Sequence, residues 1–82
     1  MPAQQKFDKA EQQERQKHAA RWLQFRRDYL FTQTKLAEAL GISRRTLQYI
    51  EAGAVTPTLT HQAAFRDYAL KCRREFGEGE AA

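Results

Sequence analysis

The sequence has little cysteine, proline or glycine, with one, two and four residues of these types among 82, and it has no long apolar run. A single cysteine excludes an intramolecular disulfide and a zinc site made of several thiolates. The two histidines, His18 and His61, lack the spacing of metal ligands, so we expect neither a metal nor a cofactor. No segment approaches about 18 consecutive apolar residues, and no signal-peptide pattern opens the chain. We therefore expect a cytoplasmic protein without a membrane span.

Groupings typical of catalysis are also missing. The sequence shows no Ser-His-acid set, no carboxylate pair placed for acid–base work and no glycine-rich phosphate loop. We therefore expect a protein that is not an enzyme and has no small-molecule substrate.

What the chain does contain is enough apolar surface for one small core and an uneven distribution of charge. Hydrophobic residues make up 41%, including five Phe, three Tyr and one Trp. A chain this short buries a limited share of its surface, so pairing with a second copy would help to stabilise it. Residues 18–59 carry six basic and three acidic side chains, which is most of the net charge of +4. A basic folded segment indicates an anionic partner such as nucleic acid.

The apolar periodicity predicts an all-α protein, a compact domain of four to five helices with a long C-terminal helix. Trp22, Phe25 and Tyr29 recur at helical spacing, and no segment alternates as a strand does. Residues 1–16 are almost all polar and are predicted to be a flexible or frayed-helical arm, while 77–82 are predicted to be a disordered tail. The ordered domain is then 17–76, with helices expected over 17–30, 33–40, 44–52 and about 59–76.

The middle of the chain carries helix caps at the spacing of a helix-turn-helix. Thr32 and Ser43 are suitable N-caps, and Gly41 can take the positive φ at the end of the first helix of the pair. Ala37 is small enough for the second helix to pack across it, and Ile42 can plug the turn. A helix-turn-helix at 33–52 would present the polar N-terminal side chains of its second helix to DNA bases in the major groove.

These residues carry a family resemblance. The run from Thr32 to Ser43, followed by Ile50-Glu51-Ala52-Gly53 and then Pro57, resembles the Cro and lambda-repressor (XRE) type of helix-turn-helix. Arg26 also stands where that family usually has an arginine. Leu30 departs from the pattern because the family often has glycine there, so we expect the first helix to end without the usual cap. Beyond Leu59 the resemblance ends.

The resemblance implies double-stranded DNA as the partner and assigns residues to it. Arginine that pairs with guanine is the commonest direct contact to a base, and Arg45 is our first candidate, followed by Arg44. The full set of predicted base contacts is Arg44, Arg45, Thr46, Gln48 and Tyr49. The predicted contacts to the DNA backbone are Thr32, Gln33, Lys35 and Ser43. Glu51 is implied to brace the turn after the recognition helix.

The last helix has an apolar stripe of Tyr68, Cys72 and Phe76, which we interpret as a homodimer interface. A dimer would read two half-sites one DNA turn apart. The alternative is that the stripe folds back on Trp22 and Phe25.

The predicted function is that of a sequence-specific, nucleoid-associated transcriptional regulator, a repressor that binds a palindromic operator as a homodimer. Two alternatives stay open. An antitoxin-like protein would bind both DNA and a partner protein, and a protein-interaction module would have lost DNA binding. The basic pair Arg44 and Arg45 argues against the latter.

Overall fold

A computed structural model describes residues 2–77 and, from residue 9 on, their side chains. These residues form four helices. No strand occurs between residues 2 and 77, so the all-α prediction is confirmed. The predicted disordered tail lies outside the described residues, apart from Gly77. The helices are α1 (Pro2–Asp28), α2 (Gln33–Leu40), α3 (Arg44–Glu51) and α4 (Leu59–Phe76).

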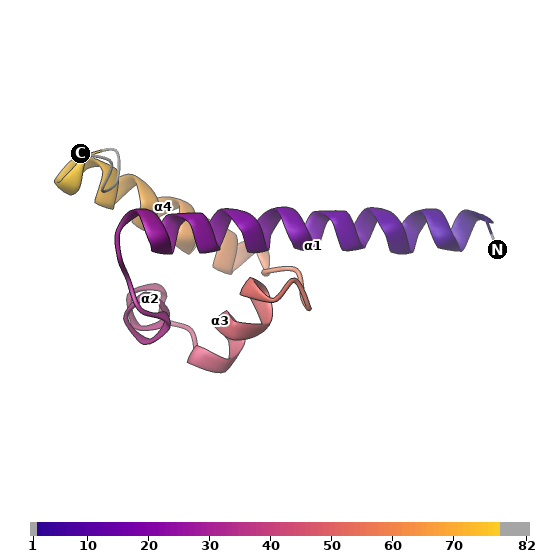
Figure 1. Cartoon of the computed structure of the whole chain (residues 1–82), viewed down its shortest axis with the longest axis horizontal. Coiled ribbons are helices and arrows are strands. Elements are labelled where there is room, and N and C mark those ends of the chain that lie inside the picture. The colour runs from indigo at the N-terminus through magenta and orange to yellow at the C-terminus, as the bar shows by residue number, and fades with distance from the viewer. Residues whose placement is uncertain (1, 78–82) are drawn as a thin grey trace.

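The helices are arranged around the C-terminal half of α1. Helices α2 and α3 lie together below it, and α4 crosses behind it (Figure 1). The N-terminal half of α1 projects beyond the other three helices, which gives the molecule an extent of 48 Å along its longest axis. Helix α3 therefore has one side against α1 and α2 and the other side toward solvent.

Helix α1 is longer than the apolar pattern indicates. It starts at Pro2, and its polar first half is rich in Gln, Glu, Lys and Ala, which favour helix. Proline suits the first helical position because its missing N–H would have no partner there. The helix runs unbroken through the predicted boundary at residue 17, and Arg15 already contacts Gly53 in the folded body. Periodicity finds only the part of a helix that buries a face, so it could not indicate this extension.

Helix α1 ends in a cap built on Leu30. This differs from our expectation that the helix would end without the usual cap. The Leu30 N–H donates to the oxygen of Arg27 at 3.3 Å, and the Phe31 N–H donates to that of Arg26 at 2.9 Å. This pair of bonds closes a Schellman cap, in which the residue after the helix takes a left-handed conformation. Leu30 has a φ of 59°, the one positive φ of a residue other than glycine among residues 2–77. The hydrogen bonds of the cap form without glycine, at the expense of backbone strain.

The core lies where the four helices meet. Helices α1, α2 and α3 contribute the buried apolar side chains between Trp22 and Ile50, and α4 adds Phe65 and Cys72. The rings of Trp22 and Phe65 stack with centroids 4.5 Å apart and an interplanar angle of 6°. This stack joins α1 to α4. The buried apolar cluster is Trp22, Phe25, Leu36, Ala37, Leu40, Leu47, Ile50, Phe65 and Cys72.

No helix between residues 2 and 77 is both long enough and apolar enough to cross a membrane.

Candidate nucleic-acid interface

The turn between α2 and α3 fixes where α3 begins. Gly41 ends α2 with a φ of 72°, and the Ile42 N–H donates to the oxygen of Ala37 at 3.0 Å. Ile42 is half-buried and packs on the core. Ser43 then caps α3, because its hydroxyl oxygen accepts a hydrogen bond from the Thr46 N–H at 3.0 Å. The first turn of α3 is thereby held with its free backbone N–H groups toward solvent.

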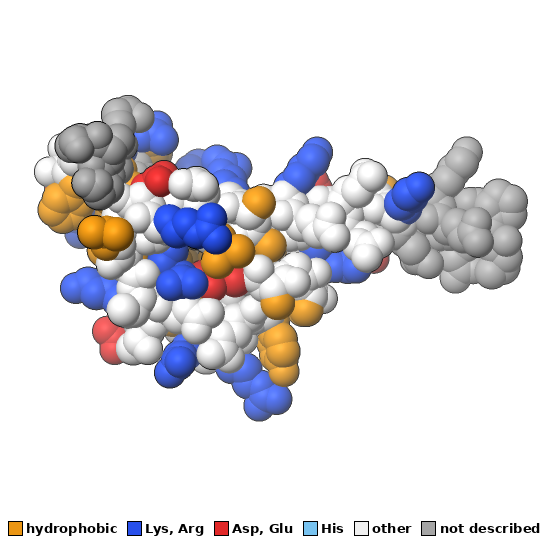
Figure 2. All heavy atoms as spheres, viewed as in Figure 1, with side chains coloured by type: hydrophobic (Ala, Val, Ile, Leu, Met, Phe, Trp, Pro, Cys, Tyr) orange, Lys and Arg blue, Asp and Glu red, His pale blue; other side chains and the backbone are white. Residues whose placement is uncertain are grey.

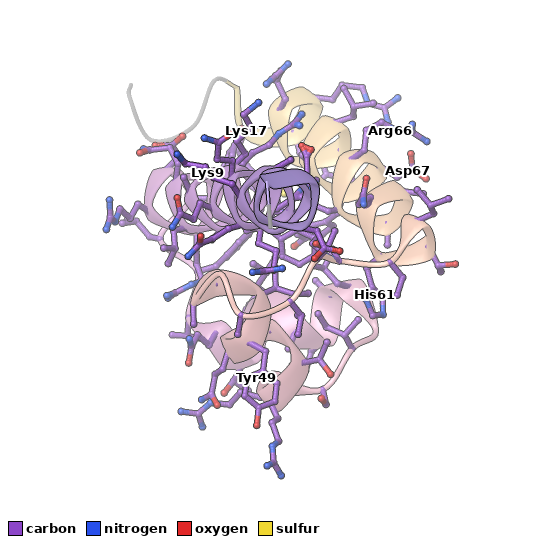
Figure 3. All side chains as sticks on the ribbon, turned by 90° about the vertical axis from the view of Figure 1, so that its right-hand side faces the viewer. Lys9, Lys17, Tyr49, His61, Arg66 and Asp67 are labelled. Atoms are coloured by element: carbon purple, nitrogen blue, oxygen red, sulfur yellow. The ribbon has the colours of Figure 1, made fainter. Side chains whose placement is uncertain are left out.

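Helix α3 divides cleanly into a buried and an exposed face. Leu47 and Ile50 are fully buried, because residues three apart lie on the same face of a helix. The opposite face is polar and exposed, and Tyr49 lies at the edge of the molecule farthest from α4 (Figure 3). Basic side chains appear along the edge formed by α2 and α3 in the space-filling view (Figure 2). The exposed residues on this face are Arg44, Arg45, Gln48 and Tyr49.

Arg45 and Tyr49 act as a unit one helical turn apart. Arg45 Nε donates to the Tyr49 hydroxyl at 3.2 Å, and the guanidinium carbon lies 5.7 Å from the centroid of the ring. A cation over an aromatic face is attracted by the negative charge of the ring's π-system. The ring therefore limits the conformations of the Arg45 side chain before any ligand arrives.

Thr46, the fifth predicted base contact, has a different environment. It is half-buried, and its hydroxyl accepts a hydrogen bond from the Ser43 hydroxyl at 2.9 Å. Its position beside the cap gives it a structural role at the start of α3. A base contact by Thr46 stays a prediction.

A chain of side-chain hydrogen bonds runs from α1 to the exposed end of α2. Arg26 binds Glu51 in a bidentate manner, with Nε to Oε2 at 2.8 Å and Nη2 to Oε1 at 3.1 Å. Gln33 Nε2 donates to the same Glu51 Oε1 at 2.9 Å, and Gln48 Nε2 donates to Gln33 Oε1 at 3.4 Å. The Glu51 side chain is only 5% exposed, and a buried carboxylate requires such partners. The role expected for Glu51, bracing the turn, agrees with this geometry.

Three of the four predicted backbone contacts gather at the N-terminus of α2, and the fourth, Ser43, caps α3. The Thr32 hydroxyl oxygen accepts from the Lys35 N–H at 3.1 Å and caps the helix, and the Lys35 side chain is exposed. Gln33 follows the cap, and its amide nitrogen has two hydrogens, of which Glu51 takes one. The second hydrogen and the dipole of the helix end both favour a phosphate at this position.

Sequence reasoning missed one contact of the site, made by Arg15. Its Nε donates to the backbone oxygen of Gly53 at 3.2 Å, and Glu11 lies 3.6 Å from its guanidinium on the next turn of α1. Gly53 ends α3, so Arg15 ties the projecting part of α1 to the C-terminal end of α3. Nothing in the local pattern indicates this pair, because it depends on how α1 crosses α3.

The predicted dimer stripe faces mostly into its own chain. Cys72 is 1% exposed within the core, and the Tyr68 ring lies beside Phe25 with centroids 6.1 Å apart. Burial raises the pKa of both the Cys72 thiol and the Tyr68 hydroxyl. Assigning Cys72 to an interface therefore needs correction, because the side chain fills a gap inside the monomer. Phe76, at 62% exposed, is the member of the stripe that stays accessible.

The fold and this exposed, capped helix define a helix-turn-helix DNA-binding domain. Residues 24–61 match the HTH_3 family, whose description is helix-turn-helix. This segment is a helix-turn-helix domain of the Cro/C1 type (XRE family), a non-catalytic DNA-binding domain, which confirms the resemblance seen in the sequence. No curated protein and no solved structure matched the chain.

Proposed function

We propose that this chain is a transcriptional repressor that binds a palindromic operator as a homodimer and acts at the nucleoid in the cytoplasm. DNA binding itself follows from the helix-turn-helix domain. The observation that carries the proposal is the exposed face of α3, where Arg44 and Arg45 extend from the first turn of a capped helix. A helix N-terminus inserted in the major groove brings such side chains to base edges.

The length of α3 supports reading by two copies. The helix has eight residues, so one copy reaches only a few base pairs. Two copies related by a two-fold axis read half-sites about 10 base pairs, or about 34 Å, apart. Phe76 offers the exposed apolar surface of the predicted stripe, and we place the contact between the copies there. A dimer bound across a promoter excludes polymerase by occupancy alone.

The roles of the side chains follow from their environments. Arg45 is hydrogen-bonded to Tyr49 on the exposed face of α3 and is suited to a bidentate contact with guanine. Gln33, oriented by Glu51, and Lys35 are suited to phosphates on either side of the groove. We propose that Arg44, Gln48 and Thr46 complete the contacts with bases, and that Thr32 and Ser43 contact the DNA backbone.

Selection of binding sites from random duplexes tests the proposal, run on wild type, Arg45→Ala and Arg66→Ala across a salt series. Arg66 lies on the opposite side of the molecule from Tyr49 and serves as the matched control (Figure 3). We expect wild type and Arg66→Ala to select the same palindrome. Arg45→Ala should weaken binding by about 1–3 kcal/mol and relax one position in each half-site.

Three results would contradict the proposal in whole or in part. Salt-dependent binding without an enriched sequence would indicate non-specific DNA binding. A single copy on the selected duplex, measured by sedimentation, would exclude the homodimer. Retained dimerisation in Phe76→Ser would move the contact between copies to another surface.

A further inference from the structure

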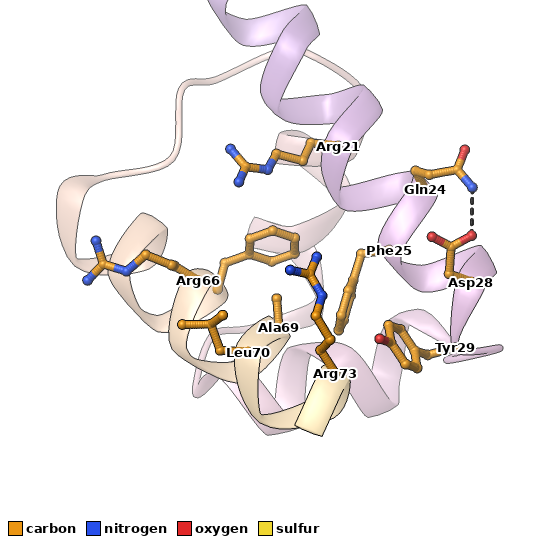
Figure 4. A pocket seen from close by; sticks show the side chains of 10 residues that line it. Arg21, Gln24, Phe25, Asp28, Tyr29, Arg66, Ala69, Leu70 and Arg73 are labelled. Atoms are coloured by element: carbon orange, nitrogen blue, oxygen red, sulfur yellow. Dashed lines mark hydrogen bonds between the residues drawn. The ribbon is translucent and has the colours of Figure 1, made fainter. Parts of the chain in front are cut away.

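The aromatic rings between α1 and α4 hold the two helices apart and leave a hollow between them. Its volume is about 360 Å³, and Phe25, Phe65 and Ala69 line it (Figure 4). We call this hollow, together with the one described next, the α1/α4 groove. Phe25 and Phe65 are more than nine-tenths buried, so the floor is rigid and apolar.

A second hollow of about 280 Å³ continues the first toward the start of α4. Arg21, Phe65 and Arg66 line both hollows, and Leu59 lines the second. Along α4 the α1/α4 groove extends from Leu59 to Arg73, which is about 21 Å at 1.5 Å per helical residue. That length fits about six residues of extended peptide at about 3.3 Å each.

Positive charge predominates around the α1/α4 groove. Arg21 from α1 and Arg73 from α4 reach over the hollow from opposite walls, and Arg66 stands at its outer edge (Figure 4). Asp28, the acidic side chain that lines it, accepts a hydrogen bond from Gln24 at 2.7 Å. Three arginines and one aspartate line the two hollows, and Arg66 also lies 3.6 Å from the exposed carboxylate of Asp67. The lining of the α1/α4 groove is therefore net positive, and carboxylates on a ligand would complement it.

The edges of the α1/α4 groove carry exposed apolar side chains. Leu59 is 82% exposed at one end and Leu70 is 47% exposed near the other. Large aliphatic groups in water beside an apolar floor are typical of surfaces that bind a partner. A small anion would leave both leucines uncovered, whereas a peptide with apolar side chains would cover them.

The α1/α4 groove faces away from the DNA-reading surface. Viewed along α1, Arg66 and Tyr49 lie at opposite edges of the molecule (Figure 3). A DNA duplex held by α3 would therefore leave it open.

We propose that the α1/α4 groove binds an acidic peptide segment with leucine or phenylalanine side chains, supplied by a partner protein, while α3 holds DNA. This activity goes beyond the proposed repression and does not depend on it, since no residue of the α1/α4 groove belongs to the DNA-binding set. The arginines bind the carboxylates, and the apolar side chains pack on Phe65, Leu59 and Leu70.

The test uses the full chain and a fluorescent peptide pool of about eight residues in which Glu or Asp alternates with Leu or Phe. Peptides with Gln or with Lys at the acidic positions are the comparison. We expect binding to the acidic pool only, with NMR shifts in α1 and α4 around the α1/α4 groove. The double variant Arg21→Glu, Arg66→Glu should bind about tenfold more weakly. Its matched control, Lys17→Glu with Arg27→Glu, changes exposed charges of α1 outside both hollows and should bind as wild type does.

Several results would overturn the proposal. No shift at millimolar peptide, or equal binding of the Gln pool, would exclude an acidic-peptide site. Shifts in α3, or displacement of the peptide by DNA, would mean that the peptide imitates DNA at the recognition helix. Dissociation of a homodimer by the double variant would make the α1/α4 groove an interface between copies. Because the peptide is measured without DNA as well as with it, failure of operator binding would not affect the result.

Discussion

Thr32 and Ser43 cap α2 and α3 through bonds to backbone groups only three residues further along the chain. Trp22 and Phe65, which join α1 to α4, stand far apart in the sequence and meet only when the chain is folded. The helix-turn-helix between Thr32 and Pro57 is thus organised largely by local bonds. The pair α1 and α4 is organised by ring packing across the molecule.

The difference shows a division of work. Local caps fix the angle and the start of α3, which is what base reading requires. The α1–α4 pair supplies most of the aromatic surface of the core and, through Arg26, one partner of the buried carboxylate Glu51. A DNA-binding motif of two short helices buries too little surface to fold alone. The flanking helices therefore stabilise a surface that they do not form.

The largest expected effect is the loss of the stack between the two flanking helices. Trp22→Ala should lower the free energy of unfolding by about 3–5 kcal/mol, because it leaves a cavity against Phe65. Urea unfolding followed by circular dichroism measures this, and Val55→Ala, at a half-exposed loop position, is the control. We expect helicity and DNA binding to be lost together. Separate transitions would show that the helix-turn-helix folds without its flanking helices.

The second expected effect concerns the ion pair that connects the two regions. Glu51→Ala leaves Arg26 without its carboxylate and should cost about 2–4 kcal/mol, somewhat less than for a fully buried pair because Arg26 is 24% exposed. Gln33 also loses its acceptor, so DNA affinity should fall. The control is Glu38→Ala on the exposed side of α2, which should change stability by less than about 0.5 kcal/mol.

The double variant Arg26→Met, Glu51→Leu separates the two expected effects of losing Glu51, the loss of stability and the loss of DNA affinity. An apolar pair of similar volume should recover part of the stability. DNA affinity should stay low, since Gln33 still lacks its acceptor. Recovery of both would show that Gln33 needs no orientation by Glu51.

The sequence was sufficient to predict the helix-turn-helix because its signals are local. The expected ranges for α2 and for the start of α3 coincide with the structure, and Thr32, Gly41 and Ser43 take the capping positions expected of them. The exposed set on α3 follows from the same periodicity, since burying Leu47 and Ile50 leaves Arg44, Arg45 and Gln48 outside. Their contacts with DNA stay predictions.

The rest depended on contacts between distant parts of the chain. Polar residues at the start of α1 give no periodic signal, so neither the extension to Pro2 nor the bond between Arg15 and Gly53 was predictable. The stripe of α4 was visible, but an apolar face does not reveal whether it covers its own core or a second copy. The structure places Cys72 in the core and leaves Phe76 exposed.

Burial of Cys72, a residue of α4, predicts that the stability of the folded protein depends on pH. Its pKa is raised by burial above the ordinary 9.0, so the unfolded chain loses the proton first as the pH rises. The stability that this group contributes is complete below pH 9.0 and is lost as the pH rises through the folded pKa. Tyr68 acts in the same direction above pH 10.0.

Urea unfolding between pH 7 and pH 10.5 on wild type and Cys72→Ala measures this effect. The variant should be about 1 kcal/mol less stable at pH 7 because it loses buried sulfur. Its stability should then fall less steeply than that of wild type above pH 9.0. Parallel curves would show that Cys72 ionises as readily in the folded chain as in the unfolded one.

The smallest expected effect compares the C-terminal caps of α1, α2 and α3. Helices α1, α2 and α3 all end in the same pair of hydrogen bonds, with Leu30, Gly41 and Gly53 in the left-handed position. A left-handed conformation costs a residue other than glycine about 1–2 kcal/mol, while glycine adds some entropy to the unfolded chain. Leu30 is 78% exposed, so its side chain contributes little packing. Leu30→Gly should therefore stabilise the protein by about 0.5–1 kcal/mol, seen as a higher midpoint of urea unfolding.

The reverse change at a matched cap, Gly41→Ala, should destabilise by about 1 kcal/mol, since its Cβ would meet no atom within 4 Å and strain alone opposes it. If Leu30→Gly were destabilising instead, Leu30 would be held by contacts outside this chain, and an exposed leucine at the end of α1 would then belong to an interface.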